Sequence, residues 1–116
     1  MKIYKTQEEI EADIVDGVLK IRGDVKFEVS FSIEAKIIVE AGNIKAEDIE
    51  AWNIEAGNIK AEDIKAGNIK AWNIEARDIS FYAVAFAYLS FKCKSIVGQR
   101  NNNKYFCLDK EVEITK

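Results

Sequence analysis

The feature that most constrains this chain is an uninterrupted repeat of five residues. Residues 41–80 read AGNIK AEDIE AWNIE AGNIK AEDIK AGNIK AWNIE ARDIS, which is eight pentads of the form Ala-x-[Asn/Asp]-Ile-x. On an α-helix this spacing turns each Ile by about 140° from the one before, so no apolar face forms. In a straight strand it places alternate Ile residues on opposite faces. The repeat therefore predicts a chain that turns one corner in each pentad.

Repeated corners of one kind wind a chain into a coil whose stacked turns pair as parallel strands. Within each pentad, Ile and the following Ala, such as Ile44 and Ala46, share a face and are expected to point inward. The Asn or Asp before each Ile is expected at the corner, because these residues tolerate a left-handed backbone. We therefore predict an all-β fold, a single-stranded parallel β-helix (solenoid) with pentad sides.

Two columns of residues predict different numbers of sides. Trp52 and Trp72 are separated by four pentads, so a coil of four pentads would stack them. Asp48, Asp63 and Asp78 recur at every third pentad, so a coil of three pentads would align them. At a strand spacing of about 4.8 Å such aligned carboxylates repel one another, and a three-sided core leaves little room for Ile. We expect four sides, with three as the alternative.

The repeat resembles that of the pentapeptide-repeat proteins, which form right-handed four-sided β-helices. In that family a small residue directly precedes Asn or Asp, whereas here Ala lies one residue earlier, as in residues 41–44. The whole chain is also similar to small uncharacterised repeat proteins of Gram-positive bacteria and their phages. That similarity covers DISFYAVAFAYLSFKCKSI at residues 78–96 and FCLDKEVEI at residues 106–114. It implies a mobile-element context and no particular biochemical activity.

The segments before the repeat are expected to complete a single domain over residues 1–116. Thr6 begins the capping-box sequence TQEE, which predicts a short helix that ends near Gly17. A helix within residues 1–17 would cover the exposed end of the coil, and a partner-binding helix is the alternative. Residues 18–40 are expected to form the first coils, because every odd position from Val25 to Ala41 is small or apolar.

After the repeat we expect the period of five to continue, giving a pentad β-helix over residues 41–91. In this reading Phe81, Phe86 and Phe91 take the Ala position, and Val84 and Leu89 take the Ile position. The segment then forms a bulkier part of the core. The alternative is an aromatic ligand pocket that includes Tyr82 and Tyr88.

Residues 92–116 are expected to hold a basic loop and a C-terminal cap strand. The sequence GQRNNNK at residues 98–104 has the composition of a loop. Four basic residues lie in or near it: Lys92, Lys94, Arg100 and Lys104. They are candidate contacts for phosphate or another anion, with a solvated loop as the alternative.

Composition excludes several classes of function. The chain has no His, so it has neither a Ser-His-Asp nor a Cys-His catalytic arrangement. Its two cysteines, Cys93 and Cys107, lack the paired spacing of a metal site, and no glycine-rich nucleotide fingerprint is present. We expect a non-enzymatic protein without cofactor or metal. The first residues do not read as a signal peptide and no apolar run could span a membrane, so a cytoplasmic location is expected.

Two classes of binding function remain. In the first, Trp52 and Trp72 form an apolar patch, rimmed by Glu50, Glu55, Lys70 and Glu75, for a protein partner or a second copy. The alternative is that each Trp belongs to the scaffold, lying over a Gly-bearing corner. In the second class, the basic C-terminal residues and the tyrosines bind nucleic acid or a nucleotide. A phage-encoded inhibitor of a host defence or DNA-processing enzyme fits either class, and it rests on the resemblance alone.

Overall fold

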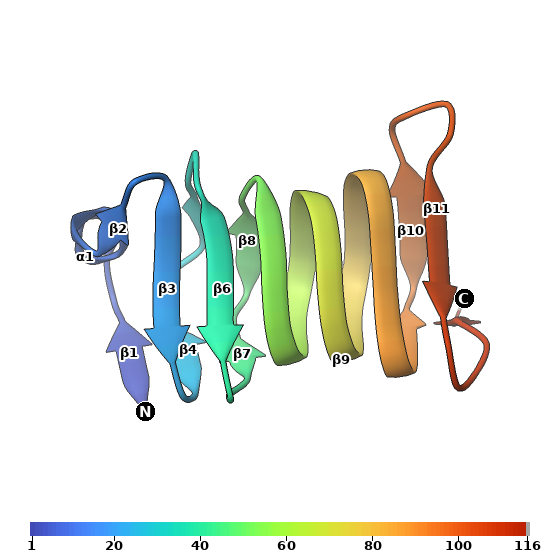
Figure 1. Cartoon of the computed structure of the whole chain (residues 1–116), viewed down its shortest axis with the longest axis horizontal. Coiled ribbons are helices and arrows are strands. Elements are labelled where there is room, and N and C mark those ends of the chain that lie inside the picture. Colours follow the sequence, from blue (N-terminus) through green and yellow to red (C-terminus); the bar gives the residue numbers. More distant parts are fainter. Residues whose placement is uncertain (116) are drawn as a thin grey trace.

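The computed structural model describes residues 1–115 and is a parallel β-solenoid of about 5 turns. The coils stack along the longest dimension of the molecule, which is 36 Å (Figure 1). Strands account for 66% of the chain and helix for 5%. The predicted all-β solenoid is therefore confirmed.

Each coil of the repeat contains three pentads, so the expectation of four sides is wrong. Ile44 pairs in parallel with Ile59, and Ile49 pairs with Ile64. Each Ile is thus in register with the Ile three pentads later. A triangular core accommodates Ile because each side sends inward only one large side chain, and the second inward residue is Ala.

The strands fall on three sides, each named here after one of its strands. The β4 side contains β1 (Lys2–Tyr4), β4 (Val25–Phe27), β7 (Ile44–Lys45) and β12 (Glu113–Ile114). The β8 side contains β5 (Phe31–Ser32), β8 (Asp48–Glu50) and β10 (Ser95–Gly98). The β6 side contains β2 (Ile14–Val15), β3 (Val18–Arg22), β6 (Lys36–Glu40) and β11 (Lys104–Cys107). Between them β9 (Asn53–Cys93) winds around all three sides (Figure 1).

The inward and outward positions of the repeat are as predicted. Every Ile of the eight pentads is at most 2% exposed, and the Ala residues from Ala51 onward are buried beside them. The charged residues between them, such as Lys60, are exposed. The same alternation holds from Val25 to Val39, but Ala41 is exposed with a φ of 52°.

The corner Asn and Asp residues do not have the left-handed backbone that the sequence led us to expect. Among residues 1–115, the non-glycine residues with positive φ are Asp16 and Ala41. The corner side chains instead link successive coils. Asn58 donates its backbone N–H to Asn43 Oδ1 at 3.0 Å, and Asn73 Nδ2 donates to Asn58 Oδ1 at 2.6 Å. The amides therefore serve as hydrogen-bonding ladders along the corners, in addition to the backbone hydrogen bonds that join successive coils there.

The aspartate column predicted for a three-sided coil is present. Asp48 pairs in register with Asp63, and burial followed by the charges of Asp48 and Asp78 raises the pKa of Asp63. Serines end the column: Ser30 Oγ donates to Asp48 at 3.3 Å and Ser95 Oγ donates to Asp78 at 2.6 Å. The carboxylates repel one another as expected. The column lies at the solvated surface, however, so this repulsion is too weak to prevent the three-sided packing of the core.

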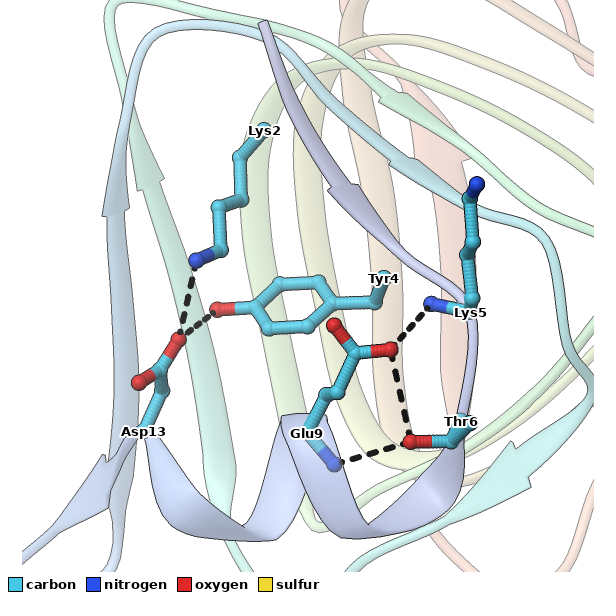
Figure 2. A network of polar contacts seen from close by, with 6 residues as sticks. All are labelled: Lys2, Tyr4, Lys5, Thr6, Glu9 and Asp13. Carbon is cyan, nitrogen blue, oxygen red and sulfur yellow. Dashed lines mark hydrogen bonds and ion pairs between the residues drawn. The ribbon is translucent and has the colours of Figure 1, made fainter.

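The N-terminal end of the solenoid carries α1 (Gln7–Ala12). Thr6 Oγ1 accepts from the Glu9 backbone N–H at 3.2 Å, while the Glu9 carboxylate accepts from the Lys5 backbone N–H at 3.2 Å (Figure 2). Ile10 is fully buried against the core. The helix ends at Ala12 and not near Gly17, because the chain returns as β2 to pair antiparallel with β3.

Side chains fasten α1 to the first coils. Gln7 Nε2 donates to the Ser32 carbonyl at 2.7 Å, and Gln7 Oε1 accepts from the Ser32 N–H at 3.3 Å. The Gln7 amide thus pairs with the edge of β5 as a further strand would. The Tyr4 hydroxyl donates to Asp13 at 2.7 Å, and Lys2 lies 3.4 Å from the same carboxylate (Figure 2). Together these contacts make α1 a cover for this end.

The coils lengthen after the repeat, so the period of five does not continue to residue 91. The Val84 N–H donates to Asn68 Oδ1, 16 residues earlier, and Ser90 Oγ donates to Asn73, 17 residues earlier. At β11, Lys104 pairs with Val84, so this coil is a whole pentad longer than a coil of the repeat. The added residues enter at corners, because the sides themselves remain in register.

The lengthening changes which residues enter the core. Ala85 and Ala87 are fully buried, whereas Phe86 is half-buried on the outer face and Leu89 is 42% exposed. The predicted core positions of Phe86, Val84 and Leu89 are therefore wrong, although Phe81 and Phe91 are buried. Alternating Ala suits the inner face, and the aromatic residues between them are left outside.

The end of the chain adds three short strands, β10, β11 and β12, one to each side. The predicted loop over residues 98–104 is shorter, because Gly98 ends β10 and Lys104 begins β11. The connection projects beyond the coil (Figure 1). No helix among residues 1–115 is long and apolar enough to cross a membrane.

Candidate binding surfaces

The two tryptophans predicted to stack lie on different corners. Trp52 occupies the corner between the β8 and β6 sides, and Trp72 occupies the corner between the β6 and β4 sides. Their separation of four pentads amounts to one complete coil plus one side, so the two indoles cannot form one patch. Both are nevertheless exposed, Trp52 at 57% and Trp72 at 53%.

Trp72 belongs to a row of four aromatic rings. Its ring centroid lies 4.8 Å from that of Tyr88, and Tyr88 meets Phe86 edge to face at 5.5 Å. Phe86 in turn stacks on Phe106 at 5.2 Å with an interplanar angle of 4°. We call these four residues the aromatic surface. It runs from the corner of Trp72 onto the β6 side and reaches β11.

Charged residues border the aromatic surface unevenly. Lys70 Nζ lies 6.0 Å from the centroid of Phe86, close enough for a weak cation–π interaction. Glu55 lies on the same side, one coil before Lys70, because it pairs in register with Ile38 of β6. Glu75 lies around the corner on the β4 side. Of the predicted rim, the structure thus brings Lys70 to the aromatic rings.

The four basic residues predicted as an anion-binding region are spread around the solenoid. Lys92 lies on the β4 side, with Glu113 at 4.0 Å, and Lys94 lies at the next corner. Arg100 lies in the connection between β10 and β11, and Lys104 begins β11 on the β6 side. These positions do not form one basic surface.

Trp52 lines a separate groove of about 570 Å³. Gly67 follows it in the next coil, with its N–H donating to the Trp52 carbonyl, and Tyr82 lies beyond Gly67 at the same corner. Among residues 1–115, neither the Trp52 nor the Tyr82 ring stacks on another aromatic ring. The charged residues lining the groove are Glu34, Glu50 and Lys65.

The titratable groups with shifted pKa values lie away from both surfaces. Burial and the Asp13 hydrogen bond raise the pKa of Tyr4, and that same hydrogen bond lowers the pKa of Asp13 at the N-terminal end. Burial raises the pKa of Cys93, which disfavours the reactive thiolate. In the described part of the chain, no group of three or more His, Cys, Asp or Glu residues could hold a metal ion.

Comparison with known protein families, curated proteins and solved structures found no match to this chain.

Sequence reasoning missed the aromatic surface because it assigned Phe86 to the core. The signal was present in residues 83–88, where Ala occupies every odd position and a bulky residue every even one. That is a period of two, typical of a strand with one small inner face. It places Phe86 and Tyr88 together on the outer face, as observed.

Proposed function

We propose that this protein is a non-enzymatic binding module, with the aromatic surface as its contact site for a protein partner. The observation that carries the proposal is the continuous row of four rings from Trp72 to Phe106, held on the outer face of a rigid strand stack. Aromatic residues are enriched where protein interfaces bind most tightly. Apolar rings left in contact with water are costly unless something covers them.

The position of the rings also suits a contact site. Ala85 and Ala87 anchor the strand in the core, so the backbone that carries Phe86 and Tyr88 is held in place. A preorganised surface loses less conformational entropy on binding. Inhibition of a host defence or DNA-processing enzyme is one role for such a module, and it rests on the sequence resemblance alone.

Nucleic-acid binding draws less support. Lys92, Lys94, Arg100 and Lys104 are distributed over different sides and corners, so a single strand of phosphates would meet few of them at once. Binding to nucleic acid depends on the number of phosphates neutralised and weakens steeply with salt. It remains the alternative function.

The test compares three forms of the protein as bait in extracts of its host. The variant Trp72→Ala with Phe106→Ser removes both exposed ends of the aromatic surface. The control, Val15→Ser, changes an apolar residue that is 67% exposed at the opposite end. We expect wild type and Val15→Ser to retain the same protein at moderate salt, and the double variant to lose it while remaining folded.

Two results would contradict the proposal. One is a partner that the folded double variant retains as well as wild type does. The other is capture of nucleic acid that moderate salt abolishes and that the double variant does not affect, which would favour the alternative function.

A further inference from the structure

The groove beside Trp52 is independent of the aromatic surface and has its own chemistry. Trp52 and Tyr82 stand at the same corner, two coils apart, with Gly67 between them. Paired strands are about 4.8 Å apart, so the backbone positions that carry the two rings are separated by about 9.5 Å. Gly67 has no side chain to fill the space between them. Both rings line the groove, and we call the part of it above Gly67, between their attachment points, the slot.

The slot has the dimensions to receive one planar group. Two aromatic contacts at about 3.5–4 Å each require a ring separation of about 7–8 Å. Small side-chain rotations would bring the rings this close, since both are more than half exposed, at 57% each. Among residues 1–115, neither ring face is covered by a cationic side chain, in contrast to Phe86 and Tyr4. No aromatic or cationic side chain of these residues thus competes with a ligand for either ring.

Charge decides which planar group fits. The groove is lined by two carboxylates, Glu34 and Glu50, and by one ammonium group, Lys65, giving a formal net charge of −1 from these groups. Glu34 lies at the corner beneath Trp52, whose N–H donates to the Ala35 carbonyl at 2.9 Å. Trp and Tyr rings attract cations to their faces, Trp most strongly. A planar cation is thus matched by the rings and by the carboxylates.

We propose that this groove binds the guanidinium group of an arginine side chain from a partner protein. Guanidinium is planar and always charged, it stacks on aromatic rings, and it forms paired hydrogen bonds with carboxylates. The volume of about 570 Å³ exceeds that of a single guanidinium and leaves room for the main chain that carries it. The site does not depend on the aromatic surface, so either one can fail without the other.

Because the chain has two tryptophans, the test has an internal reference. N-acetylarginine amide is titrated to millimolar concentrations into the intact protein, and the two indole N–H signals are followed by NMR. We expect the Trp52 signal to shift saturably while the Trp72 signal stays in place. N-acetylcitrulline amide has the same shape without the charge, and it should bind at least about 5-fold more weakly.

Variants that change the charge of the groove should change the affinity for arginine amide in opposite directions. Lys65→Ala removes a like charge and should tighten arginine amide binding by about 2–5-fold, whereas Glu50→Gln should weaken it by about the same factor. Trp52→Ala should abolish binding and leave the fold intact, because its side chain is exposed.

Other results would overturn the site. Equal binding of the citrulline compound, or tighter binding by adenosine monophosphate, would show a slot for neutral or anionic rings. Absence of any Trp52 shift, or an equal shift of Trp72, would show that no such site exists.

Discussion

The pentad region, residues 41–80, and the coils after it, residues 81–114, are built on the same triangular core but differ on the surface. In the pentad region every coil repeats the one before after three pentads, and its outer face holds mostly charged, polar or small residues, with Trp52 and Trp72 as the exposed aromatic exceptions. In the later coils the offset between paired strands grows, until at β11 it has gained a whole pentad. The added residues let aromatic side chains leave the core and gather outside. The regular repeat supplies the scaffold and its two isolated tryptophans, and the departure from regularity adds the rings that join Trp72 in the aromatic surface.

The largest expected effect comes from comparing an Ile of the pentad region with the residue of the later coils that a period of five would place at the Ile position. Ile59 is 1% exposed in the middle of the column, and Ile59→Ala should lower the free energy of unfolding by about 2–5 kcal/mol. Leu89, which the period of five would place in the core, is 42% exposed. Leu89→Ala should change stability by less than about 0.5 kcal/mol. Urea denaturation of both variants measures the difference.

Ile59→Asp sharpens this test, because an unpaired charge in the column should prevent folding. Similar losses for Ile59→Ala and Leu89→Ala would mean that the later coils keep the core of the repeat.

A smaller effect is expected at the glycine corners. A Cβ added at Gly67 would lie 2.6 Å from the Trp52 carbonyl oxygen, which belongs to the backbone of the previous coil. The coils would have to separate locally, so Gly67→Ala should cost about 1–3 kcal/mol. At Gly98 the added Cβ meets the side chain of Asn103 in an open connection, which can move. Thermal melting should therefore show a larger loss for Gly67→Ala than for Gly98→Ala, and the reverse order would contradict the tight stacking of the regular coils.

The smallest expected effect is a gain in stability, and it concerns the aspartate column of Asp48, Asp63 and Asp78. The raised pKa of Asp63 means that the fold disfavours its carboxylate, so wild-type stability should increase as pH falls through that pKa. Asp63→Asn should stabilise the protein at neutral pH by less than about 1 kcal/mol, since the site is exposed. It should also remove this increase on mild acidification. Chemical denaturation between pH 7 and the ordinary carboxyl range measures both.

Asp13 provides the control of opposite sign. Its pKa is lowered, chiefly by the Tyr4 hydrogen bond, so its contribution is present at neutral pH and is lost as pH falls through the folded-state pKa. Asp13→Asn should therefore destabilise the protein at neutral pH. A destabilised Asp63→Asn would show that the aspartate column contributes something other than repulsion.

The sequence alone was sufficient for the solenoid, the inward Ile and Ala, and the helix that begins after Thr6. These follow from local periodicity and capping, which depend on residues close together in the chain. The corner residues were predicted at the right positions for the wrong reason. Their ladder of hydrogen bonds, as between Asn58 and Asn73, joins successive coils and has no local signature.

Only the tertiary structure decided the number of sides, and with it the location of every surface. The choice between three and four pentads depends on how inward side chains fill the core together, and surface charge repulsion is too weak to settle it. That choice separated Trp52 from Trp72 and placed Trp52 in one column with Tyr82. The sequence determined which residues face outward, whereas the packing of the core decided which of them meet.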